Sequence, residues 1–595
     1  MTHPLDATVR RDIPQPSEPG ETVWGSDAIA DMLRAMDIPY VLLNPGASFR
    51  GLHDSLVNHL GNEKPQMIVV LHEEHAVAIA HGYTKVTRKP LIAILHSNVG
   101  LMHGSMAIFD AWVDRVPVIV LGATGPVDAN KRRPWIDWIH TAQDQGALVR
   151  NFIKWDAQPA SIPSAQEALL RARQIATTAP QGPVYVCFDA ALQESKLSER
   201  PALPDPSRYL APPPARPSDE VVAQAAELLS NAQRPVILMG RVSRDEEGWR
   251  QRVQLAEALN AQVLTDLKIG AAFPTDHPLH AAPSGSFLPP AAQDVLRNAD
   301  VVLSLDWLDL SGTLKQAWGD KTVGSKIIQV SVDHYSHNGW SMDHQGLPPV
   351  DLFLLCEPEP AVVLLNQQIR PRQAAVATQR PPASSPEAPT GGAMTVSTVA
   401  ATLRRAVGEE KVCLMRLPLS WSGEMWDFRH PLDFLGYDGG GGIGSGPGMA
   451  IGSALALKGT DRLPVAVIGD GDYLMGVNAF WTAANAQIPM LVVVCNNRSF
   501  FNDELHQERV AHQRGRLVEN RWIGQRISNP APDLAMMARG QGLKGIGPVE
   551  EAGELERVLL DAIAAVKKGE TVVVDVIVQT GYSPAMTAGL TRSQD

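Results

Sequence analysis

Cysteines, long apolar runs and basic tracts are scarce in this sequence, and each scarcity excludes a class of protein. The 595 residues include four cysteines, which lie far apart and form no CxxC pair: Cys187, Cys356, Cys413 and Cys495. This pattern argues against a disulfide framework or a cysteine zinc site, and it favours buried thiols in a reducing compartment. No run approaches the roughly 20 apolar residues that a membrane span requires, so we expect no membrane partner.

The charge balance is acidic. The formal net charge is -12 at pH 7 and no basic cluster is present, which argues against nucleic acid as the main partner. Residues 1–21 contain no apolar core of the kind found in secretory signals. We therefore expect a cytoplasmic protein.

Length and hydrophobic pattern together predict several domains. A chain of this length is too long for one core and suggests about three or four domains. Apolar strand-like runs alternate with helix-like segments in residues 22–193, 219–369 and 395–582. The alternation predicts an α/β fold with three doubly wound parallel sheets of the Rossmann-like kind. The strand-like runs are 67–71, 91–95, 116–121, 235–239, 301–305, 327–332, 465–468 and 490–495.

Two proline-rich segments, 198–218 and 370–394, separate these three stretches. Each contains too little apolar material to pack and favours extended backbone. Both are predicted to be interdomain linkers.

The stretch from Leu463 to Asn497 carries the strongest chemical signal. Its first strand-like run is closed by Gly469-Asp470-Gly471 and its second by Asn496-Asn497, with one helix-like segment between them. A crossover of this kind makes the two strands parallel neighbours, so Asp470 and Asn497 open onto the same crevice. A carboxylate and an amide oxygen, beside glycines that allow close backbone approach, suit a magnesium ion that holds a diphosphate.

This stretch resembles the signature of the thiamine diphosphate-dependent enzymes of the 2-oxo acid decarboxylase and acetolactate synthase kind. The resemblance covers nearly the whole chain. It implies a pyrimidine-binding domain at 22–193, a middle domain at 219–369 and a diphosphate-binding domain at 395–582. In this family the cofactor lies between the first domain of one subunit and the third domain of another, which implies a homodimer or homotetramer with its sites at the interface.

The resemblance also assigns residues to the cofactors, which are thiamine diphosphate and Mg²⁺. Gly469 and Gly471 contact the cofactor beside Asp470. Asp470, Asn497 and the backbone carbonyl of Ser499 are the implied metal ligands.

A glycine-rich segment, residues 439–446, leads into a helix-like run. So many glycines destabilise regular structure, which predicts a loop that approaches a ligand closely. The segment resembles the family loop in which one carbonyl meets the aminopyrimidine and a bulky aliphatic side chain supports the cofactor. These roles fall to Gly441 and Ile443. Upstream, Ser420 lies in a segment that resembles a Ser/Thr-rich diphosphate loop.

The strand-like run 67–71 ends in His72-Glu73-Glu74-His75. A carboxyl group at the end of a buried strand can have its protonated form favoured by desolvation, which suits proton exchange with a nitrogen heterocycle. The segment resembles the family's region around the glutamate that activates the aminopyrimidine, and Glu73 is its counterpart. Two alternatives remain at this stage: Glu74 is the active carboxylate, or both acids simply begin a solvated helix. The spacing of His72 and His75 differs from HExxH, which argues against a zinc site.

The next strand-like run ends at His96. The segment resembles most closely the benzoylformate decarboxylases within the family, where a histidine at this position relays protons to the substrate. Acetolactate synthases usually have serine or threonine there. An imidazole titrates near neutral pH, which suits such a relay. His103 follows about two helical turns later and is a candidate for the same cavity.

The substrate pocket is less well defined by the sequence. Residues 43–48 resemble the Asn-Pro-Gly-Ser loop of benzoylformate decarboxylases, but Ala47 stands where those enzymes have a serine, and Ser48 is displaced by one position. The substrate therefore does not carry over with the resemblance. After the metal ligands, Phe500, Phe501 and His506 are candidates for a mixed pocket wall that a charged segment covers as a lid.

The middle domain shows no flavin signal. Where the resemblance would place the flavin motif of acetolactate synthases, residues 304–310 read Ser-Leu-Asp-Trp-Leu-Asp-Leu, and no GxGxxG follows a strand. We expect no FAD and a spacer role for this domain.

The sequence predicts a thiamine diphosphate- and Mg²⁺-dependent enzyme that decarboxylates a 2-oxo acid, with carboligation of the enamine to an aldehyde or second oxo acid as a further activity. One alternative is a carbon–carbon ligase or lyase resembling acetolactate synthase or 2-hydroxyacyl-CoA lyase, although no coenzyme A motif supports the latter. Another is a non-catalytic cofactor-binding protein.

Overall fold

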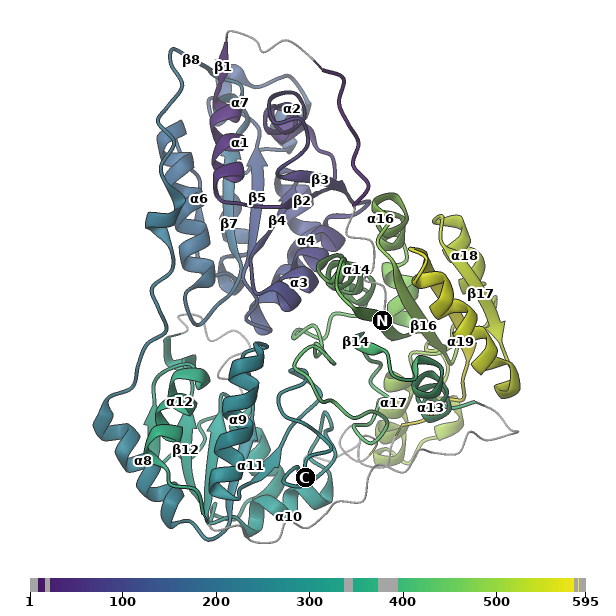
Figure 1. The fold of residues 1–595 in the computed structure, drawn as a ribbon. Helices are drawn as coiled ribbons and strands as arrows, with labels where there is room; N and C mark the ends of the chain where they lie inside the picture. Colours follow the sequence, from purple (N-terminus) through teal and green to yellow (C-terminus); the bar gives the residue numbers. More distant parts are fainter. Residues whose placement is uncertain (1–8, 17–21, 336–345, 373–393, 583–586, 588–595) are drawn as a thin grey trace.

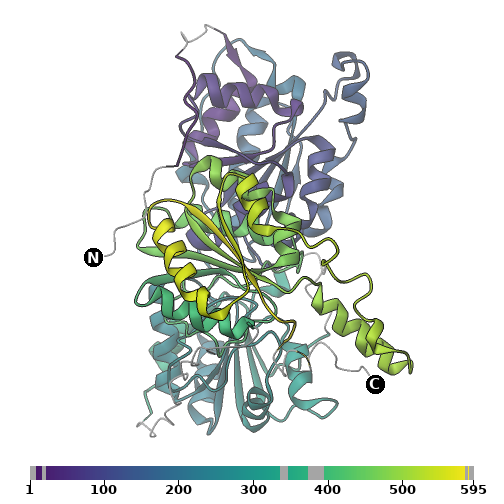
Figure 2. The same cartoon turned by 90° about the vertical axis from the view of Figure 1, so that its right-hand side faces the viewer.

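The computed structural model describes residues 9–16, 22–335, 346–372, 394–582 and 587. Figure 1 shows three α/β domains, with the first at the top, the second at the lower left and the third at the right. Turned by 90°, the third domain lies in front of the other two (Figure 2). Most of the predicted linker 370–394 falls outside the described residues.

The first domain is built on a six-stranded parallel sheet with the order β3-β2-β4-β5-β7-β6. A two-stranded antiparallel pair, β1 and β8, lies beside it. The strands are β1 (Val23–Trp24), β2 (Tyr40–Leu43), β3 (Gln66–Val69), β4 (Leu91–Leu95), β5 (Val118–Thr124), β6 (Asp156–Ala157), β7 (Val184–Asp189) and β8 (Lys196–Leu197). The helices are α1 (Gly25–Ala35), α2 (Arg50–Asp54), α3 (Glu73–Thr87), α4 (Ser97–Val113), α5 (Ile136–Ile139), α6 (Ile162–Thr177) and α7 (Ala190–Gln193).

Both faces of this sheet are covered by helices, which explains why its strands read as continuous apolar runs. In β4, Leu91, Ala93 and Leu95 pack on the side of α3 and α4. Ile92 and Ile94 pack on the other side, with α1 and α6. The sheet is therefore doubly wound.

The middle domain contains a five-stranded parallel sheet with the order β10-β9-β11-β12-β13. Its two faces are covered by separate apolar clusters. The strands are β9 (Pro235–Met239), β10 (Gln262–Leu264), β11 (Val301–Leu305), β12 (Lys326–Val330) and β13 (Leu352–Leu354). The helices are α8 (Asp219–Asn231), α9 (Glu246–Leu259), α10 (Pro290–Asn298), α11 (Leu310–Trp318) and α12 (Pro358–Gln368).

The third domain contains the third parallel sheet, with the order β14-β15-β16-β18-β17. The strands are β14 (Lys411–Arg416), β15 (Arg462–Gly469), β16 (Met490–Asn496), β17 (Lys544–Val549) and β18 (Thr571–Ile577). The helices are α13 (Val396–Val407), α14 (Ser445–Leu457), α15 (Asp470–Gly476), α16 (Ala479–Ala486), α17 (Phe501–Gln513), α18 (Leu534–Gly540) and α19 (Ala552–Val566).

The crossover between β15 and β16 differs from the single helix that the sequence predicts. It consists of two helices, α15 and α16, separated at Val477 and Asn478. Gly476 ends α15 against the glycine-rich loop, where an added Cβ would lie 2.3 Å from the carbonyl oxygen of Gly444. The chain turns at this contact because its backbone packs directly on that loop.

These sheets confirm the predicted fold class of three parallel, helix-flanked α/β domains. All four cysteines are buried and unpaired, as their spacing predicts. Within the described residues, no helix combines the length and apolar character needed to cross a membrane.

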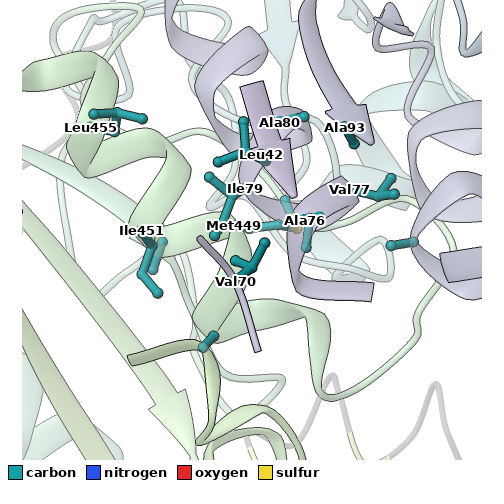
Figure 3. Packing of buried hydrophobic residues seen from close by; sticks show 14 of the residues in the cluster. Leu42, Val70, Ala76, Val77, Ile79, Ala80, Ala93, Met449, Ile451 and Leu455 are labelled. Atoms are coloured by element: carbon teal, nitrogen blue, oxygen red, sulfur yellow. The ribbon is translucent and has the colours of Figure 1, made fainter. Parts of the chain in front are cut away.

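The first and third domains share one hydrophobic core, because α3 packs against α14. Figure 3 shows Ala76, Ile79 and Ala80 of α3 beside Met449 and Ile451 of α14. Nearly every residue of α14 is buried, as expected for a helix that is apolar on all sides.

Glycines bring the two helix backbones into direct contact. A Cβ on Gly82 of α3 would lie 2.1 Å from the carbonyl oxygen of Met449, and one on Gly452 of α14 would lie 1.9 Å from that of Ile79. Because both obstructions are backbone atoms, side-chain rotation cannot relieve them.

Replacing Gly452 with Ala tests this contact. We expect the methyl group to push α3 and α14 apart and to lower the free energy of unfolding by about 1–3 kcal/mol or more. Gly553→Ala in α19 is the control, since nothing lies within 4 Å of its added Cβ. Denaturant unfolding of both variants would contradict the packing argument if they were equally stable.

Candidate active site

A cavity of about 890 Å³ opens at the carboxyl ends of β15 and β16. All three domains contribute to its walls: α4 of the first, the loops around α11 of the middle domain, and several loops of the third. Ten of the sequence-predicted site residues line it: Ser420, Gly441, Ile443, Gly469, Asp470, Gly471, Asn497, Ser499, Phe500 and Phe501.

Asp470 has the properties of a metal ligand. Its side chain is only 3 % exposed, and it makes no ion pair within the part of the chain that the structure describes. Burial raises the pKa of this carboxyl group to about 6, against hydrogen bonds from backbone amides that lower it. A buried carboxylate with no cationic side chain is stabilised by a bound cation.

Asn497 and Ser499 lie beside Asp470. The backbone N–H of Ser499 donates to Asp470 Oδ2 at 3.2 Å and to Asn497 Oδ1 at 2.9 Å. This contact holds the carboxylate, the amide oxygen and the Ser499 backbone together. A donor set made only of oxygens suits Mg²⁺, so these residues fit the ion that the resemblance implies.

The glycine-rich loop lies across the same cavity. Gly441 and Gly444 have φ angles of +72° and +103°, which side-chain-bearing residues rarely adopt. Ile443, between them, is 41 % exposed and lines the cavity. An exposed aliphatic side chain on a loop of this conformation fits the predicted role of supporting a cofactor.

Two buried carboxylates anchor the loop, and the sequence did not reveal either. The N–H of Gly441 donates to Asp438 Oδ1 at 2.7 Å, and the N–H of Gly444 donates to Asp472 Oδ1 at 2.6 Å. Arg416 pairs with both acids, at 2.7 Å to Asp438 and 3.4 Å to Asp472. The loop is therefore positioned by charged groups beneath it.

Asp110 of α4 is the third acid at this loop and also escaped the sequence analysis. It is 1 % exposed, and no side-chain donor among the described residues reaches its oxygens. Burial and the nearby Asp438 raise its pKa to about 9, while Arg416 opposes the shift. A Cβ on Gly440 would lie 2.3 Å from Asp110 Oδ1, so the loop lies directly against this carboxyl group.

Glu73 and His103 lie together in the first domain, outside this cavity. Glu73 is 6 % exposed at the start of α3, and His103 Nδ1 donates to its Oε2 at 3.0 Å from α4. His72 precedes Glu73 and stacks on His103, with ring centroids 4.9 Å apart. The predicted acid and imidazole are thus brought together by tertiary packing.

Ser48 and His96 form a second pair in the first domain. Ser48 Oγ and His96 Nδ1 are 2.9 Å apart, and the N–H of Ser97 donates to Ser48 Oγ at 3.2 Å. His140, which the sequence analysis missed, packs edge-on against His96 with centroids 4.6 Å apart. Burial, followed by His140, lowers the pKa of His96, so its imidazole is neutral at pH 7. Ala47 is exposed beside Ser48.

The predicted residues therefore fall into two separate groups within one chain. The cavity group belongs to the third domain, and the Glu73 and His96 groups belong to the first. His506 is half-buried on α17 and belongs to neither.

The middle domain contributes more to the cavity than a spacer would. Its walls there include Arg241, Lys268, Trp307 and Asp309. Two of these, Trp307 and Asp309, lie in the segment that was read for a flavin motif, and the expectation of no FAD stays a prediction.

Comparison with known proteins assigns the chain to a family. Residues 23–148, 222–342 and 418–576 match the family profiles of the N-terminal TPP binding domain, the central domain and the C-terminal TPP binding domain of thiamine pyrophosphate enzymes. The chain belongs to the thiamine pyrophosphate enzymes. The predicted family is confirmed, and the α/β folds described above are its thiamine diphosphate-binding and central domains.

Relatives of this thiamine diphosphate enzyme include decarboxylases and synthases. Benzoylformate decarboxylase of Pseudomonas aeruginosa is 25 % identical over 84 % of this chain and 89 % of its own. A probable 2-ketoarginine decarboxylase of the same organism is 26 % identical, covering 91 % and 92 %. The mitochondrial acetolactate synthase catalytic subunit of Saccharomyces cerevisiae is 22 % identical, covering 91 % and 79 %.

A solved structure has the same fold. The crystal structure of benzoylformate decarboxylase from Polynucleobacter necessarius superposes with a TM-score of 0.79 at 21 % identity, covering 94 % of this chain and 99 % of that one.

Replacing Asp110 with Asn tests its protonation. Because the pKa in the folded state lies above the ordinary value, folding takes up a proton between those two pH values, and stability falls as pH rises. We expect the wild type to lose unfolding free energy from about pH 5 to about pH 9, and Asp110→Asn to lose less. Urea unfolding across this range measures the difference, with the exposed Asp561→Asn as control. If the unfolding free energy changed with pH equally in all three proteins, the raised pKa of Asp110 would be contradicted.

Proposed function

We propose that this enzyme uses thiamine diphosphate and Mg²⁺ to decarboxylate a 2-oxo acid. The observation that carries the proposal is the buried, uncompensated carboxylate of Asp470 beside Asn497 and Ser499, facing the exposed Ile443 across one cavity. The benzoylformate and 2-ketoarginine decarboxylases among its relatives support this reaction.

The third domain would hold the cofactors. Asp470, Asn497 and the Ser499 carbonyl would bind Mg²⁺, and Ser420 lies in the same cavity as a contact for the diphosphate. Gly441 would accept a hydrogen bond from the aminopyrimidine, and Ile443 would support the ring system. When bound, thiamine diphosphate supplies the electron sink that loss of carbon dioxide requires.

Glu73 would hydrogen-bond a ring nitrogen of the cofactor and exchange a proton with it. Its burial and the hydrogen bond from His103 hold the carboxyl group in one place. Glu73 does not line the cavity of its own chain, so we propose that a second copy supplies it and that the enzyme works as a homodimer or homotetramer.

His96 would move protons at the substrate. Its pKa is lowered, so the neutral ring can accept a proton at pH 7, and Ser48 at 2.9 Å orients the ring. An imidazole here favours decarboxylation over an acetolactate synthase-like reaction. Carboligation to an acceptor remains the second candidate, because acetolactate synthases are among the relatives.

A panel of 2-oxo acids, assayed for carbon dioxide release with and without an aldehyde acceptor, tests the proposed reaction. We expect turnover of at least one acid by the wild type, and a loss of about 10²- to 10⁴-fold in Glu73→Gln, because the amide cannot exchange the proton. Cofactor binding should be retained by this variant.

Glu74→Gln is the matched control, since Glu74 is the neighbouring acid that the sequence left as an alternative. We expect it to retain most of the activity. If Glu74→Gln were inactive and Glu73→Gln active, the role would pass to Glu74. If no member of the panel released carbon dioxide, the decarboxylase proposal would fail.

Asp470→Asn tests the metal site. We expect thiamine diphosphate with Mg²⁺ to raise the thermal midpoint of the wild type, and this shift to be largely lost in the variant because the metal loses its charged ligand. Asp461→Asn, an exposed position just before β15, should keep the full shift. If thiamine diphosphate with Mg²⁺ raised the thermal midpoint equally in all three proteins, Asp470 would not be a metal ligand.

A further inference from the structure

His72, Glu73 and His103 form a cluster of metal-binding groups that lies outside the cavity. One ligand atom from each lies within 4.8 Å of the other two. Among the residues that the structure describes, no other group of three or more histidine, cysteine, aspartate or glutamate side chains is arranged in this way.

The sequence did not predict this cluster. The spacing of His72 and His75 argued against a zinc site, and that argument concerned two histidines on one segment. The third group comes from a different element, since His103 lies on α4, 30 residues after Glu73. Gly100 lets α4 approach, because a Cβ there would lie 3.0 Å from Glu73 Oε1.

The three groups are held close to a metal-binding arrangement. In a tetrahedral site with bonds of about 2.0–2.1 Å, two ligand atoms lie about 3.3 Å apart. His103 Nδ1 and Glu73 Oε2 are 3.0 Å apart. His72 stacks on His103 with an interplanar angle of 21°, so the two ring planes are nearly parallel.

The imidazoles of His72 and His103 make few other contacts that would compete with a metal ion. His72 Nδ1 accepts from the N–H of Glu74 at 3.3 Å, a long hydrogen bond that caps α3. In the single chain the His103 side chain is 50 % exposed, so the cluster lies at the surface that the proposed function turns toward a second copy.

The ligand types select the ion. Two imidazoles and one carboxylate are the donor set of many zinc sites with an open position, whereas Mg²⁺ prefers oxygen ligands alone. We propose that His72, Glu73 and His103 bind a first-row transition metal ion of the Zn²⁺ class, with water in the remaining position. This site is separate from the oxygen site around Asp470.

Such binding has a consequence for activity that rests on the proposed function. A metal ion on Glu73 occupies the carboxylate that the cofactor would need. The ion would therefore inhibit turnover, in contrast to the Mg²⁺ that supports it.

Co²⁺ absorption on tag-free, full-length enzyme with saturating Mg²⁺ tests the site itself. We expect one equivalent of Co²⁺ to bind with the intense visible bands of four-coordinate cobalt. His103→Gln and His72→Gln should each weaken binding by more than about tenfold. Unfolding midpoints show whether each variant is folded, and the exposed position of His103 makes its variant the safer of the two.

Two variants serve as matched controls. His277 pairs with Glu257 at 3.3 Å in the middle domain without a third ligand, so His277→Gln should leave Co²⁺ binding unchanged. Asp470→Asn should also leave it unchanged. The absence of one-equivalent binding by the wild type, or unchanged binding in folded His103→Gln and His72→Gln, would overturn the proposal.

Zn²⁺ titration of turnover separates this site from the proposed function. We expect Zn²⁺ to inhibit the wild type, and His103→Gln to need about tenfold more Zn²⁺ for the same inhibition. This result supports both the metal site and the catalytic role of Glu73. If Co²⁺ binds as expected but Zn²⁺ bound at the same residues leaves turnover unchanged, the metal site stands and the catalytic role of Glu73 is overturned.

Discussion

The close packing of α3 against α14 is the constraint on which the rest of the structure depends. It places backbone against backbone at Gly82 and Gly452 and joins the first and third domains in one core. These helices also position the candidate site residues: α3 begins at Glu73, and α14 follows the loop that carries Ile443. A shift at this crossing would therefore move both.

Charge distribution distinguishes the two sides of the cavity. Beneath the glycine-rich loop, three buried acids face a single guanidinium group, that of Arg416, and burial together with the nearby Asp438 raises the pKa of Asp110. Asp470, by contrast, forms no ion pair with any described residue. The loop is thus positioned by a buried network of charged groups, whereas the hydrogen bonds to Asp470 come from backbone amides.

Parallel strands were the features best predicted from the sequence. The predicted bounds of β4, β9 and β11 agree with the structure, because strands covered on both faces are continuous apolar runs with clear ends. The crossover after Asp470 was predicted less well. Helices α15 and α16 follow each other in one continuous apolar pattern, so the sequence does not mark the break between them. At that break the backbone packs against Gly444, which belongs to another segment.

The sequence by itself determined the family, the three parallel sheets, and the positions of Asp470 and Asn497 directly after β15 and β16. These features depend on local patterns and on residues that follow directly after strands. Only the tertiary structure decided which side chains meet across elements: Asp110 at the glycine-rich loop, Ser48 at His96, and His103 at Glu73. Such contacts depend on how closely helices and loops approach one another, and that distance is determined by packing in three dimensions rather than by spacing along the chain.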